Sequence, residues 1–213
     1  MRTDELVSLL ASGETAVDPR TLQRRYAIAL GWGAFGATLL MALLLGVRPD
    51  LPEAARLPMF WVKLAFPATL LAGALLATAR LSRPGMRVGR VAAVLAAPVL
   101  AIWLLAFVAL LNAVPEEWEA LVFGDTWTEC LINIPVLSVP AFVAVFWAVR
   151  GLAPTRLALA GGAAGLLAGA IGALSYALHC PEMAAPFLGI WYLLGMLIPT
   201  AAGAFLGLRL LRW

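Results

Sequence analysis

Two cysteines and a single histidine are the residues of this sequence that can take part in the widest range of reactions. Cys130 begins one long apolar stretch, and Cys180 follows the end of the next, directly after His179. Two neighbouring thiols can oxidise to a disulfide in an oxidising compartment, or bind a soft metal ion together with an imidazole. Their spacing leaves three interpretations open: a structural disulfide, a pair that senses oxidants or metals, and two unpaired buried cysteines.

The apolar stretches between the cysteines determine where the thiols lie. They cover residues 130–149 and 157–178, and a short basic turn over residues 150–156 joins them. About 20 helical residues cross a hydrocarbon core roughly 30 Å thick, so the sequence predicts a hairpin of two transmembrane helices. Such a hairpin places both thiols at the face of the membrane opposite the turn. A metal site there would use Cys130, Cys180 and His179.

The composition of the whole chain is that of a polytopic membrane protein. Of its 213 residues, 63% are hydrophobic and 13% are charged, and the mean hydropathy is +0.93, whereas about a quarter of the residues in soluble domains are charged. We expect an all-α fold, in which a short segment over residues 1–26 precedes a bundle over residues 27–213. The six predicted transmembrane helices cover residues 27–47, 60–79, 91–113, 130–149, 157–178 and 187–207.

The distribution of basic residues predicts the orientation of the bundle. An even number of spans puts both termini on one side, and 12 of the 15 lysine and arginine residues fall there, the exceptions being Arg48, Arg56 and Lys63. Loops rich in lysine and arginine stay in the cytoplasm. The sequence therefore predicts a multi-pass protein of the bacterial inner membrane, with both termini cytoplasmic and both thiols on the periplasmic side.

The first ten residues, MRTDELVSLL, have the pattern of a short helix. Polar residues that favour a helix start precede a narrow leucine stripe on one face. These residues are Thr3, Asp4 and Glu5, followed by Leu6, Leu9 and Leu10. Because so short a helix is not stable alone in water, we expect an amphipathic cytoplasmic helix that folds against a partner protein or the membrane surface.

One charge and one glycine pattern stand out within the spans. Lys63 lies near the outer end of its span, so we expect its side chain to reach the membrane surface, with ion binding inside the bundle as the alternative. Gly161, Gly165 and Gly169 recur every four residues, and such a ridge lets another helix approach closely. We expect this ridge to pack within the chain, and dimerisation is the alternative.

Motifs of the common enzyme classes are missing from the sequence. It contains no G-x-S-x-G or H-E-x-x-H motif and no P-loop or dinucleotide fingerprint, and its one histidine gives a catalytic triad little support. We therefore expect a protein that is not an enzyme, has no constitutive cofactor and does not bind nucleic acid directly. A small inner-membrane transporter or metal-export subunit is the alternative, with Lys63, Asn112 and Asn133 as its pathway residues.

Several short stretches are similar to one known family. MRTDELVSLLA at the start, TWTECL around Cys130, YALHCPE around Cys180, WYLLGM and the terminal RLLRW resemble the NrsF family, whose members are six-span integral-membrane anti-sigma factors of proteobacteria. The resemblance implies that the N-terminal segment holds an extracytoplasmic-function sigma factor at the membrane. It also implies that Cys130 and Cys180 respond to a transient heavy-metal ion or an oxidant and cause release. The sigma-binding positions would be among Thr3, Asp4, Glu5, Leu6, Leu9 and Leu10.

Overall fold

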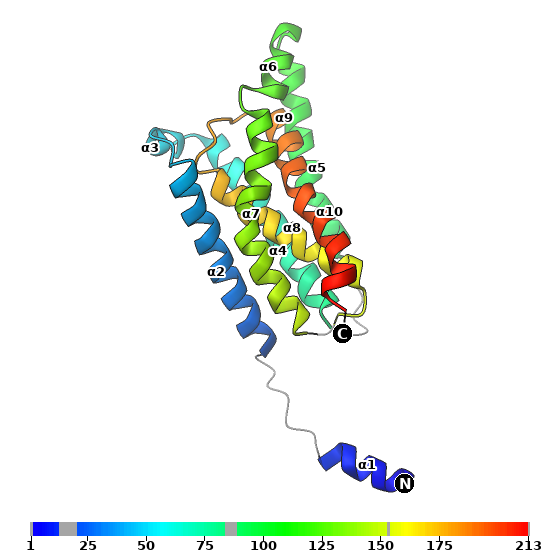
Figure 1. Cartoon of the computed structure of the whole chain (residues 1–213). Coiled ribbons are helices and arrows are strands. Elements are labelled where there is room, and N and C mark those ends of the chain that lie inside the picture. The colour runs from blue at the N-terminus through cyan, green and yellow to red at the C-terminus, as the bar shows by residue number, and fades with distance from the viewer. Residues whose placement is uncertain (1, 13–20, 84–88, 153, 213) are drawn as a thin grey trace.

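A computed structural model describes residues 2–12, 21–83, 89–152 and 154–212 of the chain (Figure 1). The described residues form helices and loops without any strand, and six of their helical segments are long and apolar enough to cross a membrane. The all-α, six-span prediction is confirmed. The long helices are α2 (Thr21–Leu44), α4 (Pro58–Leu81), α5 (Val91–Asn112), α7 (Trp127–Arg150), α8 (Leu157–Tyr176) and α10 (Leu193–Leu210).

Short helices stand before or between these spans. The fourth apolar helical segment starts with a 3₁₀ turn and a short helix before α7, and the sixth starts with a short helix and a π-helical turn before α10. With these short elements included, both segments are longer than the spans that the sequence predicts. The short elements are α1 (Thr3–Ser12), α3 (Leu51–Ala54), η1 (Pro115–Glu117), α6 (Trp118–Phe123), α9 (Ala185–Phe187) and η2 (Leu188–Tyr192).

Helix α8 is the centre of the bundle. It packs against α10, α7 and α4, and 61% of its span is buried, compared with 6% for α5. The sequence of α8 explains this position, because its glycines and alanines let three helices approach closely. The ridge of Gly161, Gly165 and Gly169 faces the backbone of α10 around Pro199, Gly203 and Gly207, so the ridge packs within the chain.

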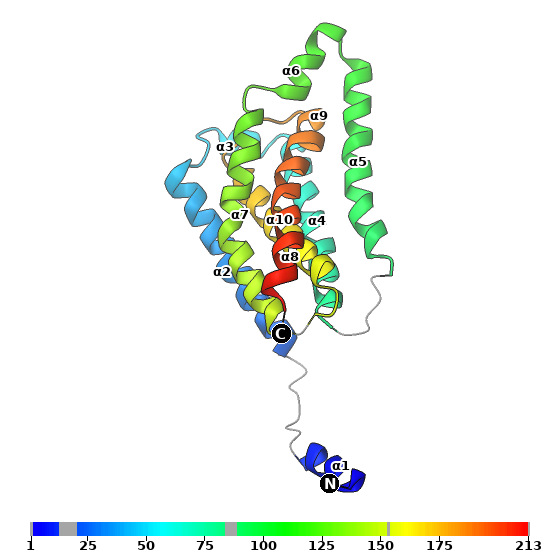
Figure 2. The same cartoon turned by 45° about the vertical axis from the view of Figure 1, so that its right-hand side comes forward.

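Helix α5 stands at the edge of the bundle (Figure 2). It touches α4 along one side and α9 and η2 near its end, and apolar side chains such as Leu100, Leu104 and Phe107 are exposed along it. A helix that is apolar all round and barely buried by protein suits a lipid environment. The exposed apolar surface of this helix therefore agrees with a membrane protein.

The two ends of the bundle differ in what they carry. One end, here called the terminal end, contains the start of α2 and the end of α10 (Figure 1). The opposite end, called the thiol end, contains α3, η1, α6, the start of α7 and the end of α8, and therefore both cysteines. Helix α1 is drawn apart from the six long helices, on the side of the terminal end (Figure 1).

Candidate functional site

The two cysteines meet at the thiol end, as the hairpin of α7 and α8 requires. Cys130 lies in the first turn of α7, where its N–H donates to the Thr126 carbonyl oxygen at 3.1 Å. Cys180 lies in the loop between α8 and α9, and its N–H donates to the Tyr176 carbonyl oxygen at 3.0 Å. Both side chains have no exposed surface, and the two thiols are free and interact with each other. The sequence prediction that they share one end is therefore met.

Lys63 of α4 lies against this thiol pair. The expectation that its side chain reaches the membrane surface is wrong, because the residue is fully buried. Its Nζ donates to the carbonyl oxygen of Cys180 at 2.5 Å and to that of Glu182 at 2.9 Å. A buried ammonium is costly unless it is paired or hydrogen-bonded. The two carbonyl oxygens of the Cys180 loop, together with the Tyr192 ring 5.7 Å away, provide that compensation.

Two tyrosines complete the buried cluster. Tyr176, the last residue of α8, and Tyr192, the last residue of η2, are both fully buried. Among the described residues, neither hydroxyl has a partner at hydrogen-bonding distance and angle. Both hydroxyls nevertheless interact electrostatically with Cys130 and Cys180. π-Helical turns are rare and occur frequently at functional sites. Here the π-helical turn ends with Tyr192 beside Lys63 and the thiols.

The environment of Cys180 favours its ionised form. The hydrogen bond from the Cys130 thiol lowers the pKa of the Cys180 thiol below its usual range, and the nearby Lys63 charge acts in the same direction, while burial opposes both. The thiolate is the form of cysteine that attacks electrophiles and binds metals. Within the buried cluster, these contacts favour the thiolate of Cys180.

The Cys180 loop is attached to several neighbouring elements. From the segment after α2, the Arg48 Nη1 donates to the Cys180 carbonyl oxygen at 3.2 Å, and the Arg48 N–H donates to that of Leu178 at 3.2 Å. The Glu182 Oε1 accepts from the Asp125 N–H at 2.9 Å, just before α7. The Arg48 side chain is itself held by Asp50, whose hydrogen bond raises the pKa of the guanidinium. The loop thus connects the segments before α3 and α7 with α4.

His179 takes a structural position in this arrangement. Its Nδ1 lies 2.9 Å from the Gly46 carbonyl oxygen, so Nδ1 carries the proton and donates to that oxygen. Among the described residues, no group of three or more histidine, cysteine, aspartate or glutamate side chains could hold a metal ion. The predicted set of Cys130, Cys180 and His179 is therefore not assembled here, because the imidazole is turned toward the α2 end. The two thiols remain together as a potential metal-binding pair.

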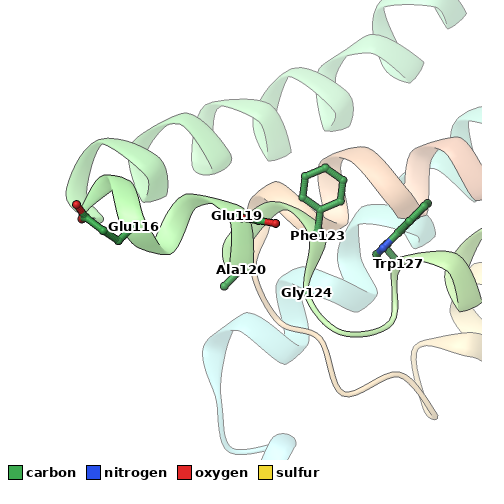
Figure 3. A pocket seen from close by; sticks show the side chains of 6 residues that line it. All are labelled: Glu116, Glu119, Ala120, Phe123, Gly124 and Trp127. Carbon is green, nitrogen blue, oxygen red and sulfur yellow. The ribbon is translucent and has the colours of Figure 1, made fainter.

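A shallow hollow lies near the thiol end, outside the buried cluster. It is lined by Glu116, Glu119, Ala120, Phe123, Gly124 and Trp127 (Figure 3). In Figure 3 the Phe123 and Trp127 rings stand at one end of the hollow and Glu116 at the other. Trp127 also packs on Trp191, with ring centres 4.7 Å apart. The hollow contains neither cysteine, so it is separate from the thiol pair.

The predicted sigma-binding residues lie in α1. The Glu5 carboxylate accepts a hydrogen bond from the Arg2 N–H at 3.1 Å, which satisfies a free backbone donor before the helix. Thr3, Asp4, Glu5 and Leu6 are exposed. The side chains of Leu9 and Leu10 lie outside the described part of the chain. The structure therefore confirms the predicted helix and leaves its role in binding as a prediction.

The sequence does not predict that Lys63, Tyr176 and Tyr192 belong to the buried cluster. Lys63 stands out in the sequence only as a charge within a span, because its partners are backbone carbonyls more than 100 residues away in the chain. The positions of the two tyrosines in the sequence, near the same predicted span ends as the cysteines, are the feature that points to them. Tyr176 precedes Cys180 by four residues, and Tyr192 lies at the same end of the next span.

Comparisons with known proteins agree on one family. The family model described as "Negative regulator of sigma F" (NrsF) matches residues 10–213. The chain is 55% identical over 213 residues to the probable anti-sigma-F factor NrsF of Azospira oryzae, and 40% identical over 215 residues to the anti-sigma-F factor NrsF of Caulobacter vibrioides. Each match covers 100% of both chains. No solved structure shows significant similarity to the chain.

Proposed function

Because the chain belongs to the NrsF family of anti-sigma factors, we propose that it holds an extracytoplasmic-function sigma factor at the inner membrane through α1. Heavy-metal ions or oxidants then act on Cys130 and Cys180, and the sigma factor is released. Membership of this family makes the protein a membrane-embedded anti-sigma factor whose partner is a sigma factor, and its relatives are regulators rather than enzymes. The observation that carries the proposal is the buried, free thiol pair at the end of the bundle opposite the termini.

The character of α1 supports its role as the docking element. It is a ten-residue helix, too short to be stable alone in water. Leu6 and Val7 expose 43% and 59% of their surface, with Asp4 and Glu5 in the first turn. A short helix with an apolar stripe and an acidic start can lie in a groove of a basic partner. A sigma factor binds DNA, and the α1 helix would offer it such a surface.

The charge distribution supports the proposed orientation. Described arginines such as Arg24, Arg150 and Arg209 lie at the terminal end, next to the ends of their helices. Acidic residues such as Glu53, Glu119 and Glu129 lie at the thiol end. Loops rich in lysine and arginine stay in the cytoplasm. This rule supports the proposal that α1 meets the sigma factor in the cytoplasm and that the thiols lie on the periplasmic side. The periplasm is oxidising, so oxidants as well as metal ions would be present at the membrane face near which the buried thiols lie.

The thiol pair offers two chemical inputs. A soft metal ion would bind both sulfurs as thiolates and displace their protons. Alternatively, an oxidant would accept two electrons while both thiols lose their protons and one sulfur–sulfur bond forms. Either change alters a cluster that is fully buried in the structure. To convert a mostly bound sigma factor into a mostly free one, the change must weaken its binding by about a hundredfold, or roughly 3 kcal/mol.

The rival function, a small transporter or metal-export subunit, finds little support in the arrangement of its proposed residues. The Lys63 ammonium is held by carbonyl oxygens at the thiol end. Asn112 is exposed on the peripheral helix α5 and donates to the Val108 carbonyl oxygen at 2.8 Å. Asn133 lies in α7 beside Tyr176. The three side chains therefore line no common path through the described bundle.

The sensing half of the proposal is tested by replacing Cys130 and Cys180 together with serine. The variant should still hold the sigma factor in membranes, because serine preserves the size of the buried side chains. A sigma-dependent reporter should then stop responding to cadmium or chromate. An unchanged response of the double variant would refute the sensing role.

The docking half is tested on α1. Leu6→Ala, combined with Asp4→Ala, should abolish co-purification of the sigma factor without loss of membrane insertion. Ser8→Ala is the control for a polar-to-alanine change in the same helix, because residue 8 shares the face of Asp4 and lies opposite Leu6. Sigma factor that still co-purifies with the Asp4/Leu6 variant would exclude α1 as the docking element.

A further inference from the structure

Helix α4 has a buried polar contact at each of its ends. At the thiol end, Lys63 binds the carbonyl oxygens of Cys180 and Glu182. At the terminal end, the Ser82 hydroxyl donates a hydrogen bond to the Thr78 carbonyl oxygen at 2.7 Å and accepts one from the Tyr26 hydroxyl at 2.7 Å. Lys63, Ser82 and Tyr26 are all buried, with 0%, 1% and 5% of their surface exposed. The rest of the buried surface of α4 is mainly apolar.

The contact at the thiol end makes α4 sensitive to the Cys180 loop. Both hydrogen-bond acceptors of the Lys63 ammonium are backbone atoms of that loop. If the loop moves, the ammonium loses its partners inside an apolar bundle, which is a strongly unfavourable state. Either the thiol end of α4 must then follow the loop, or the Lys63 side chain must turn toward water.

The contact at the terminal end leads to the N-terminal segment. Tyr26 lies in the second turn of α2, which follows residues 1–20 in the sequence. Because Ser82 donates to Thr78, its oxygen is the acceptor and the Tyr26 hydroxyl is the donor. Helix α4 otherwise packs mainly on α8 and α5, whereas α2 packs mainly on α7 and α8. The Tyr26–Ser82 bond is therefore a specific polar connection between two helices that share little other surface.

We propose that α4 is the element that transmits the state of the thiol pair to α2 and so to the sigma-binding segment. Lys63 is the positioning residue at its input, and the Tyr26–Ser82 hydrogen bond is its output. This inference rests on the proposed function, and it adds the route of the signal. The direct alternative is that the thiol-bearing hairpin of α7 and α8 acts on α2 alone, because α2 packs along α7.

The proposal makes opposite predictions for the two ends of α4. Lys63→Met removes the charge at similar length and frees the Cys180 loop, so reporter activity without any inducer should rise about tenfold. Lys63→Arg keeps a cation and should remain closer to the native protein. Tyr26→Phe removes one hydroxyl at the output, so basal activity should stay low and the response to cadmium should fall about tenfold. In the protein that carries both Lys63→Met and Tyr26→Phe, the reporter activity without inducer should return to the low level of Tyr26→Phe alone.

Two measurements separate transmission from damage. At a pH high enough for Cys180 to ionise without help from the Lys63 charge, alkylation of Cys180 by a small maleimide in membranes should accelerate in Lys63→Met. It should stay unchanged in Tyr26→Phe, which lies at the other end of the bundle. Thr69→Val is the control for losing a hydroxyl on α4, because the Thr69 hydroxyl bonds only within its own helix, to the Ala65 and Phe66 carbonyl oxygens. This control should behave like the native protein in every assay.

The proposal is overturned if Tyr26→Phe stays fully inducible, or if the double variant keeps the high basal activity of Lys63→Met. If Lys63→Met fails to accumulate in membranes, the inducibility of Tyr26→Phe alone decides. Failure of the proposed function looks different. In that case the Cys130→Ser, Cys180→Ser protein still responds to cadmium, whatever the α4 variants do.

Discussion

Gly172 provides the sharpest structural test, because it stands where the two helices of the α7–α8 hairpin touch. A methyl group added at Gly172 of α8 would lie 2.7 Å from the Ile134 carbonyl oxygen and 2.9 Å from the Ser138 nitrogen of α7. Ordinary contacts begin at 3.4 Å. Both neighbours are backbone atoms, so no side chain can rotate away. Gly172→Ala therefore forces α7 and α8 apart.

The size of the effect follows from a matched substitution on the same helix. At Gly162, an added methyl would meet the Ala204 Cβ at 3.5 Å, which is ordinary contact. Both changes gain the same helix propensity of about 1 kcal/mol, so this gain cancels in the comparison. The remaining difference is the overpacking cost, about 1–3 kcal/mol. We expect Gly172→Ala to melt several degrees below Gly162→Ala.

Purified protein in detergent, followed by intrinsic fluorescence on heating, measures this difference. A second measurement is the yield of the Cys130–Cys180 disulfide under mild oxidation, which should fall in Gly172→Ala and remain native in Gly162→Ala. Equal melting temperatures and equal disulfide yields for the two variants would refute the close packing of α7 on α8.

Three further variants test the surroundings of the site. Glu182→Ala removes the carboxylate that accepts a hydrogen bond from the Asp125 N–H, so maleimide should alkylate Cys130 and Cys180 several-fold faster. Glu129 is an exposed residue in the first turn of α7, and Glu129→Ala should leave the alkylation rate unchanged. Cys130→Ala removes the donor that lowers the Cys180 pKa, so the thiolate fraction at neutral pH falls and the pH profile of Cys180 alkylation should move to higher pH; an unmoved midpoint would contradict this. Trp103→Phe removes the bond from the indole to the Gly189 carbonyl oxygen at 3.0 Å, which should cost about 1 kcal/mol, seen as a lower melting temperature; an unchanged one would mean that α5 does not depend on this bond.

The sequence predicts the number of spans and the location of the thiols because both depend on local properties. Apolar length alone identifies a transmembrane helix, and a hairpin fixes which ends of its helices lie together. The predicted start of the fourth span at Cys130 was three residues late, since α7 begins at Trp127. The sequence also predicts the packing of the α8 glycine ridge, because close helix contact requires small residues at this spacing.

The details of the site depend on contacts that no local pattern contains. The sequence predicts that Lys63 reaches the membrane surface, because a lysine near a helix end usually does. Its burial follows from two carbonyl oxygens of the Cys180 loop, and such backbone partners leave no trace in the sequence. His179 was expected among the metal ligands because it adjoins Cys180. Its side chain instead satisfies the Gly46 carbonyl oxygen, in a turn that sequence spacing does not predict.

We propose that the chemical state of the thiol pair at one end of the bundle controls retention of the sigma factor at the other, and one measurement tests this link directly. The complex of the full-length protein with its sigma factor, reconstituted in nanodiscs, can be titrated with cadmium while free thiols and released sigma factor are counted in the same sample. We expect release to rise in step with the loss of alkylatable Cys130 and Cys180. Complete occupation of both thiols with the sigma factor still bound would contradict the account.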